Sequence, residues 1–161
     1  MVERSCRGYD FTVAEFELPL SPSLQNRLEG ELKKEVGMGK TILVVDDEEE
    51  ILHLCERKLT DAGYRAITAE NGMEALNKAK GDLPDMILMD IMLPDIDGSE
   101  VVLRLKGEPQ TEKIPVIFLS GIIARSEGPK DGINVGGEYY DVIAKPIQFN
   151  ELLAYIKQKL A

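Results

Sequence analysis

Short apolar runs alternate with segments in which apolar residues recur every three or four positions, from Thr41 to the end of the chain. The runs predict strands near 41–46, 64–68, 85–90, 115–119 and 140–144, and the periodic segments predict helices near 48–61, 71–80, 98–106, 122–134 and 148–160. Strands without polar alternation are typical of parallel sheets whose two faces are covered. The pattern therefore predicts an α/β fold with a five-stranded parallel sheet flanked by helices.

The predicted helix over 122–134 has the weakest pattern of the five. Gly128, Pro129 and Gly132 fall inside it, and Gly136 and Gly137 follow closely. A glycine in a helix interior costs about 1 kcal/mol relative to alanine, and a proline costs about 3 kcal/mol. We expect a short or broken helix there.

The sequence predicts two parts, a separate extension over residues 1–38 and a folded domain over residues 39–161. Phe11–Leu20 resembles an edge strand, and Leu24, Leu28 and Leu32 share one face of a short charged helix. That helix could pack on the domain or pair in a coiled coil. The extension could be a linker, or it could result from a start codon assigned upstream of the natural one. Lys34–Val36 can be encoded by a bacterial ribosome-binding sequence, which would make Met38 the natural first residue.

Composition narrows the classes of function. The chain of 161 residues is 43% hydrophobic and 30% charged, which are globular values, and its formal net charge is −10. This charge argues against a nucleic-acid partner. Cys6 and Cys55 are far apart in sequence, and Cys55 lies on an apolar helix face, so we expect a buried reduced thiol. No apolar stretch is long enough to span a membrane and no secretion signal precedes the domain, so we expect a cytoplasmic protein without a membrane partner.

Polar residues appear where the predicted strands end. Asp46 and Asp47 follow the first strand, Asp90 ends the third, Ser120 the fourth, and Lys145 the fifth. The carboxyl ends of parallel strands meet at one edge of the sheet, where ligands of open α/β folds bind. Three carboxylates, a hydroxyl and an ammonium group at one edge predict a site for a divalent cation and a phosphoryl group.

Other polar residues have structural interpretations. Asp46 and Asp47 could instead only cap the following helix. Asp97 is expected to cap the helix at 98–106, and Asp95 to form a turn with Pro94. The single histidine, His53, is expected on the exposed face of its helix.

Four segments together resemble the receiver domain of two-component response regulators. They are Val44–Glu48, Met89–Gly98, Phe118–Gly121 and Ala144–Pro146. The resemblance extends from about Lys40 to Leu160. It implies a flavodoxin-like, doubly wound sheet in the order 2-1-3-4-5 with helices on both faces.

The resemblance also implies roles for the residues at the strand ends. Asp90 would accept a phosphoryl group, and Mg²⁺ would be bound directly by Asp47, Asp90 and the backbone carbonyl of Met92. Asp46 would act on the cation through a water molecule. Mg²⁺ prefers oxygen ligands and neutralises the incoming phosphate, which a weak carboxylate nucleophile requires.

Three further residues complete the implied site. Lys145 would contact a phosphoryl oxygen, and Ser120 would move to hydrogen-bond the aspartyl phosphate. The Lys145–Pro146 peptide would be cis. Many receivers carry an aromatic residue three positions before the lysine, but here that position is Val142. Either Tyr139 or Tyr140 has taken over its role, or the aromatic part of the switch is missing.

We therefore expect a stand-alone receiver, a signalling switch more than a metabolic enzyme. It would take phosphate from a histidine kinase or a phosphotransfer protein and bind a downstream effector through the fourth helix, fifth strand and fifth helix. Alternatives are a phosphorelay intermediate that passes phosphate to a histidine phosphotransfer domain, the receiver fragment of a hybrid kinase, and a docking module independent of phosphorylation. A hydrolase with Asp90 as nucleophile is disfavoured, because haloacid-dehalogenase-like phosphatases carry an aspartate at the position of Met92. The stimulus, the kinase, the output partner and the oligomeric state stay open.

Overall fold

The computed structural model describes residues 21–35, 39–121 and 132–160. The chain divides into two units, Met1–Leu32 and Lys33–Ala161, and the division falls within helix α1 (Pro22–Glu35). This helix contains Leu24, Leu28 and Leu32, as their spacing predicts. The predicted strand at Phe11–Leu20 lies outside the described residues, and the assignment of residues 1–38 as an extension stays a prediction.

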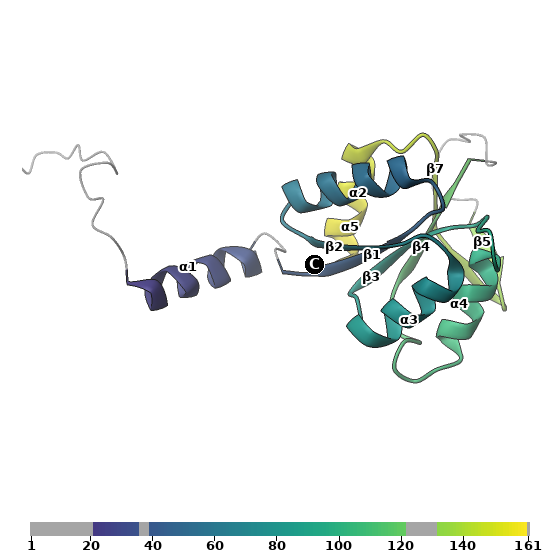
Figure 1. Cartoon of the computed structure of the whole chain (residues 1–161), viewed down its shortest axis with the longest axis horizontal. Helices are drawn as coiled ribbons and strands as arrows, with labels where there is room; N and C mark the ends of the chain where they lie inside the picture. The colour runs from purple at the N-terminus through teal and green to yellow at the C-terminus, as the bar shows by residue number, and fades with distance from the viewer. Residues whose placement is uncertain (1–20, 36–38, 122–131, 161) are drawn as a thin grey trace, which may run out of the picture. The chain divides into compact units, whose positions relative to one another are not determined.

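A five-stranded parallel sheet forms the centre of the second unit (Figure 1). Its strands, in spatial order, are β2 (Arg65–Ala69), β1 (Thr41–Val45), β3 (Met86–Asp90), β4 (Val116–Ser120) and β7 (Val142–Ala144). Every neighbouring pair is parallel. Numbered within this sheet, the order is 2-1-3-4-5, which confirms the predicted fold class.

In the described part of the chain, helices cover both faces of the sheet (Figure 1). On one side, α2 (Glu49–Asp61) and α5 (Phe149–Leu160) pack against alternate strand residues such as Ile42 and Val44. On the other side, α3 (Gly72–Asp82) and α4 (Gly98–Lys106) pack against Leu43 and Val45. The side chains of β1 alternate between two buried layers, which explains why its sequence is apolar without interruption.

The segment before the last strand differs from the prediction. Residues 122–131 of the predicted helix at 122–134 lie outside the described residues, but its end is not helical. Instead β5 (Ile133–Val135) and β6 (Glu138–Tyr140) form an antiparallel hairpin in which Ile133 pairs with Tyr140.

The physical reason lies in the turn of this hairpin. Gly136 and Gly137 adopt positive φ angles of 61° and 95°, which glycine tolerates without strain and which match the twist of a tight hairpin. The predicted strand at 140–144 is therefore divided: Tyr140 belongs to β6, and only Val142–Ala144 joins the parallel sheet. The helix prediction for 132–134 was wrong.

Among the residues that the structure describes, no helix combines the length and the apolar character that a membrane span needs.

Candidate functional site

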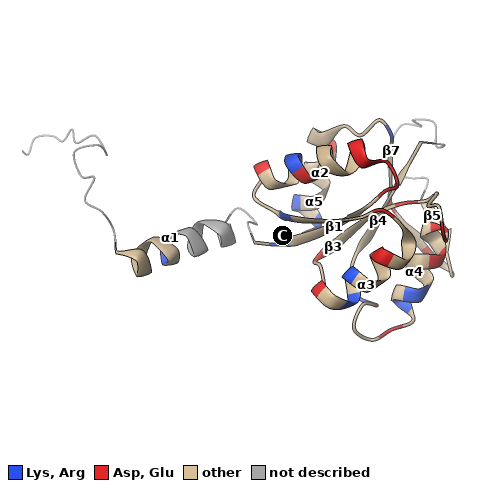
Figure 2. Cartoon of the chain, in the orientation of Figure 1, with Lys and Arg blue, Asp and Glu red and all other residues tan. Residues whose placement is uncertain are grey.

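The carboxyl ends of β1, β3, β4 and β7 surround a pocket of about 220 Å³. Its lining consists of polar and apolar residues from all four strand ends: Asp47, Glu48, Asp90, Ile91, Met92, Ser120, Gly121 and Lys145. Acidic residues are dense in the loop from β1 to the start of α2, as Figure 2 shows. The structure thus brings the polar residues of separate strand ends to one place.

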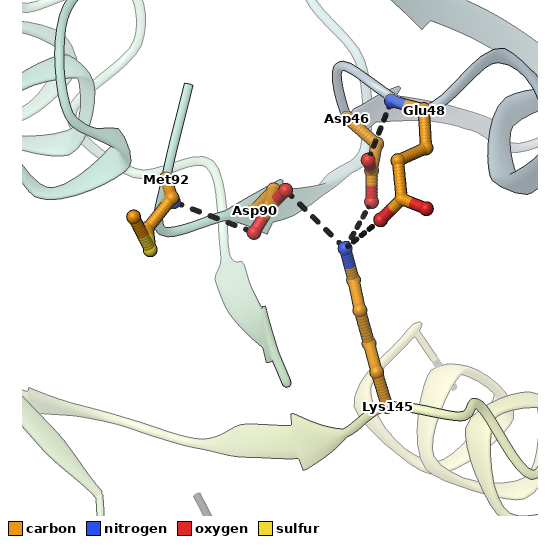
Figure 3. Close-up of polar contacts among 5 residues, drawn as sticks. All are labelled: Asp46, Glu48, Asp90, Met92 and Lys145. Carbon is orange, nitrogen blue, oxygen red and sulfur yellow. Dashed lines mark hydrogen bonds and ion pairs between the residues drawn. The ribbon is translucent and has the colours of Figure 1, made fainter. Parts of the chain in front are cut away.

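The ammonium group of Lys145 lies among three carboxylates (Figure 3). Its Nζ is 2.5 Å from Asp46 Oδ2, 3.2 Å from Asp90 Oδ2 and 3.7 Å from Glu48 Oε1. The first two contacts are hydrogen bonds between oppositely charged groups. Lys145 therefore acts as the internal counter-ion of the acidic residues.

Asp46 is fully buried and both of its carboxylate oxygens have partners. Oδ2 accepts from Lys145, and Oδ1 accepts from the backbone N–H of Glu48 at 2.9 Å. A buried charge is tolerated when it is paired and hydrogen-bonded in this way. Glu48 is the residue that precedes α2, and its own side chain makes no capping hydrogen bond.

The carboxyl group of Asp90 is also largely buried, with 7% of the residue exposed. Its Oδ1 lies 3.4 Å from the backbone nitrogen of Met92, which donates to it. Burial raises the pKa of Asp90, and the negative charge of Asp46 raises it further, while Lys145 acts in the opposite direction. The positive charge of Lys145 thus favours the ionised form of this buried carboxyl group.

The pKa of Lys145 is raised above its ordinary value. Burial alone would lower this pKa, but the hydrogen bond and the charge of Asp46, together with those of Asp90, outweigh burial. The side chain is thus a permanent positive charge at neutral pH.

Ser120 is buried at the end of β4, and its carbonyl oxygen accepts a hydrogen bond of 2.8 Å from the backbone N–H of Lys145. This bond extends the pairing of β4 with β7 and fixes the point from which the lysine side chain reaches the carboxylates. The Lys145–Pro146 peptide is cis, which confirms the expectation.

The donor atoms present fit a hard divalent cation. Carboxylate oxygens of Asp46, Asp47 and Glu48 lie within 4.8 Å of one another, and oxygen is the ligand atom that Mg²⁺ prefers. Glu48 was not among the predicted site residues, because its place in the sequence suggested only the first turn of a helix. Its position directly after the paired aspartates at a strand end was the available signal.

Asp95 also has more contacts than a turn residue needs. Its carboxylate accepts from the backbone N–H groups of Gly72 at 2.7 Å and Met73 at 2.9 Å, at the start of α3. Asp97 does stand at the N-cap position of α4, but its side chain makes no capping hydrogen bond. His53 is exposed and pairs with Glu49, as expected for a surface residue.

The two candidate tyrosines differ in environment. Tyr140 is buried in the core beside α4, whereas Tyr139 is 78% exposed. Cys55 is a free thiol buried in the core on the other face of the sheet, which confirms the prediction of a reduced buried cysteine.

Comparison with known proteins supports the resemblance noted from the sequence. The family model of the response regulator receiver domain matches residues 42–157. Response regulator PleD of Caulobacter vibrioides is 40% identical over 120 residues, which are 74% of this chain and 26% of PleD. Polar-differentiation response regulator DivK of Brucella anthropi is 37% identical over 124 residues, 76% of this chain and 98% of DivK.

One of the similar solved structures contains a magnesium ion. The receiver domain of sensor histidine kinase PA1611 from Pseudomonas aeruginosa, with a magnesium ion coordinated in its active-site cleft, superposes with a TM-score of 0.64. It is 28% identical, and the match covers 76% of this chain and 97% of that domain. The present chain spans about a quarter of PleD but nearly all of DivK. Because the family model covers most of the chain and these relatives share its sequence, the chain belongs to the response regulator receiver family.

Proposed function

We propose that this chain is a cytoplasmic phosphorylation switch in which Asp90 accepts a phosphoryl group from a phosphohistidine. The donor is a histidine kinase or a histidine phosphotransfer protein, Mg²⁺ is the cofactor, and the phosphorylated form binds a downstream effector protein. Nucleic acid is not the partner of this chain, since its net charge of −10 would repel a phosphate backbone.

One observation carries this proposal. The ammonium group of Lys145 lies between the carboxylates of Asp46 and Asp90, although these residues are 99 and 55 positions away in the sequence. A fixed positive charge beside a buried carboxylate is suited to a reaction that brings additional negative charge to that carboxylate. A purely structural ion pair would not require Asp90 to face a pocket lined by other acidic groups.

The reaction follows from these contacts. A carboxylate oxygen of Asp90 attacks phosphorus, the P–N bond of the phosphohistidine breaks, and the leaving imidazole takes up a proton as the acyl phosphate forms. The Lys145 ammonium holds a phosphoryl oxygen. The candidate ligands of the cation are Asp47, Asp90 and the Met92 carbonyl, with Asp46 acting through water. When bound, Mg²⁺ would neutralise charge on the phosphoryl group.

The switch follows phosphorylation. The hydroxyl of Ser120 moves to hydrogen-bond the acyl phosphate, and this movement shifts the population between two conformations. Because Ser120 ends β4 and its carbonyl accepts from the backbone N–H of Lys145, a movement of Ser120 is passed to the segment that follows β7 and leads into α5. These elements form part of the proposed effector surface.

Phosphoryl transfer is tested with acetyl phosphate and Mg²⁺, followed by intact-mass measurement. Wild type gains one phosphoryl group, and Asp90→Ala gains none. Asp61→Ala, which removes an exposed carboxylate at the end of α2, is the control and gains the group as wild type does. Modification of Asp90→Ala to the same extent would refute the assignment of the acceptor. Lys145→Ala should still accept some phosphate, but should signal poorly.

A relay role is the second candidate, favoured by the similarity to the receiver domain of a sensor histidine kinase. In a relay role, this chain would pass the phosphoryl group from Asp90 onward to another histidine. The test is a chase of labelled protein with candidate histidine phosphotransfer proteins. Transfer of label to a histidine identifies a relay intermediate, and retention of label until hydrolysis identifies a terminal switch.

A further inference from the structure

The loop from Ile91 to Asp97 leaves the proposed acceptor Asp90 and is held tightly at its far end. The backbone N–H of Gly98 donates to the carbonyl of Ile91 at 2.8 Å. A Cβ atom on Gly98 would lie 2.1 Å from the carbonyl oxygen of Asp90, so only glycine allows this approach. The loop thus closes on itself directly behind Asp90.

The same loop is fixed to α3 at its middle. The Asp95 carboxylate accepts from Gly72 N–H at 2.7 Å and from Met73 N–H at 2.9 Å. Next to it, the side chain of Ile96 lies against Gly72, where a Cβ atom would be 2.3 Å from Ile96 Cγ1. A polar and an apolar contact therefore join the loop to the first turn of α3.

Electrostatics strengthen the polar contact. The first turn of a helix has unsatisfied N–H groups and a partial positive charge, which favour a carboxylate. Hydrogen bonds from Gly72 and Met73 hold the pKa of Asp95 below its ordinary value, against a smaller opposing effect of burial. The N-cap residue of α3, Asn71, accepts with its side chain from the N–H of Glu74. Asp95 therefore supplies the side-chain acceptors for the two preceding N–H groups of the first turn.

We propose that Asp95 is a positioning residue for the cation site. It fixes the loop segment that carries Met92, three residues earlier in the chain, and so holds the Met92 carbonyl in place for Mg²⁺. This inference rests on the proposed function, since Met92 is one of the ligands assigned there. Asp95 does not touch the cation or the phosphoryl group, and it acts through the backbone between residues 92 and 95.

The test measures Mg²⁺ affinity by isothermal titration calorimetry on the full chain. Asp95→Ala should weaken Mg²⁺ binding by about tenfold, the lower end of the effect of losing a group that orients a metal ligand. Asp97→Ala is the matched control, because it removes the same charge from the same loop but no capping hydrogen bond. Its affinity should stay within about twofold of wild type, since it leaves the outer-shell partner in place.

Stability is measured beside affinity, because Asp95→Ala also removes a cap. Thermal melts establish that each variant is folded at the titration temperature. If Asp95→Ala does not fold, Asp95→Asn decides: it keeps the shape and one acceptor oxygen, and should bind Mg²⁺ with intermediate affinity. A folded Asp95 variant with lower melting temperature and unchanged affinity would overturn the inference, because Asp95 would then be only a structural cap.

The outcome for wild type separates the two proposals. If wild type binds Mg²⁺ and is phosphorylated on Asp90 while Asp95 variants bind equally well, only the positioning role is lost. If wild type neither binds Mg²⁺ nor takes up the phosphoryl group, the proposed function itself is refuted.

Discussion

Tyr140 packs edge-on against Phe118, with ring centroids 5.8 Å apart and ring planes at 89°. The two rings come from β6 and β4, and Lys106 Nζ lies 5.8 Å from the centre of the Tyr140 ring. Phe118 is also the partner of Val142 across the parallel sheet. The hairpin therefore supplies a buried aromatic ring beside the position where many receivers have their own.

Tyr140 should make a large contribution to stability. Tyr140→Ala removes a buried ring from the core and should lower the free energy of unfolding by about 3 kcal/mol, measured by urea denaturation. Tyr139→Ala, at the adjacent exposed position, should change it by less than about 0.5 kcal/mol. Equal effects of the two substitutions would show that the hairpin does not pack as described.

Tyr140 should also make stability depend on alkaline pH. Burial and the hydrogen bond to Glu138 raise the pKa of Tyr140 from 10.0 to about 12. The contribution of this shift to the free energy of unfolding is therefore complete below pH 10, the pKa of the tyrosine in the unfolded chain. It is lost as the pH rises through about 12, the pKa in the folded protein. In Tyr140→Phe this part of the alkaline destabilisation should be absent. Phenolate absorbance and circular dichroism, followed together in both proteins, test it.

Removing Lys145 should expose the electrostatic conflict of the acidic residues. Lys145→Ala leaves the buried Asp46 carboxylate without its ammonium partner and should destabilise the protein by about 2 kcal/mol. Added Mg²⁺ should raise the melting temperature more in this variant than in wild type, since the cation replaces the lost positive charge. Lys113→Ala, an exposed lysine, is the control for charge alone. An equal Mg²⁺ response in all three proteins would argue against a shared cation and lysine site.

Glu48 should strengthen the binding of Mg²⁺ although it was not among the predicted ligands. Its carboxylate lies in the acidic cluster and 3.7 Å from Lys145, but it is exposed, so the effect of one charge is at most about 1 kcal/mol, or roughly fivefold in affinity. Glu48→Gln should show this loss by calorimetry. Glu50→Gln is the control, because it removes the same charge two residues later on α2. If this control weakens Mg²⁺ binding as much as Glu48→Gln does, the loss reflects long-range charge and not a position beside the cation.

Two glycine substitutions should have opposite effects. Gly98→Ala places a methyl group against the Asp90 carbonyl and should destabilise the protein by about 1–3 kcal/mol, as overpacking does. Gly81→Ala, near the end of α3 with no atom within 4 Å of the new methyl group, should stabilise by up to about 1 kcal/mol. Urea denaturation of both variants tests the close approach of Gly98 to the Asp90 carbonyl. An unchanged free energy of unfolding in Gly98→Ala would contradict it.

Cys55 should be unreactive in the folded protein. Burial is the main cause that raises its pKa to about 12, and a protonated, inaccessible thiol is a poor nucleophile. In a Cys6→Ser background, labelling by a thiol reagent should follow global unfolding. Rapid labelling under native conditions would show that α2 opens locally.

The sheet and the gathering of polar residues at one of its edges could be predicted because they depend on local signals. Uninterrupted apolar runs identify buried strands, and the polar residue that ends each run identifies the shared edge, as for Asp90 and Ser120. The hairpin was missed because its glycines were interpreted as helix breakers. Gly136 and Gly137 between two short runs of strand-forming residues were a usable turn signal.

Contacts between distant segments could not be predicted in this way. The bonds from Gly72 and Met73 to Asp95 join an N–H pair and a carboxylate that belong to different elements, and no sequence spacing encodes them. The contact of Glu48 with Lys145 likewise depends on how far the lysine reaches across the sheet edge.

The ion pair of Lys145 with Asp46 connects the first and last strands of the sheet through side chains that meet only after every strand between them is in place. Copies whose sheet is incompletely assembled therefore lack this ion pair beside Asp90. Under the proposed function, immature or damaged molecules would take up no phosphate from the donor, and the extent of labelling would count correctly assembled copies.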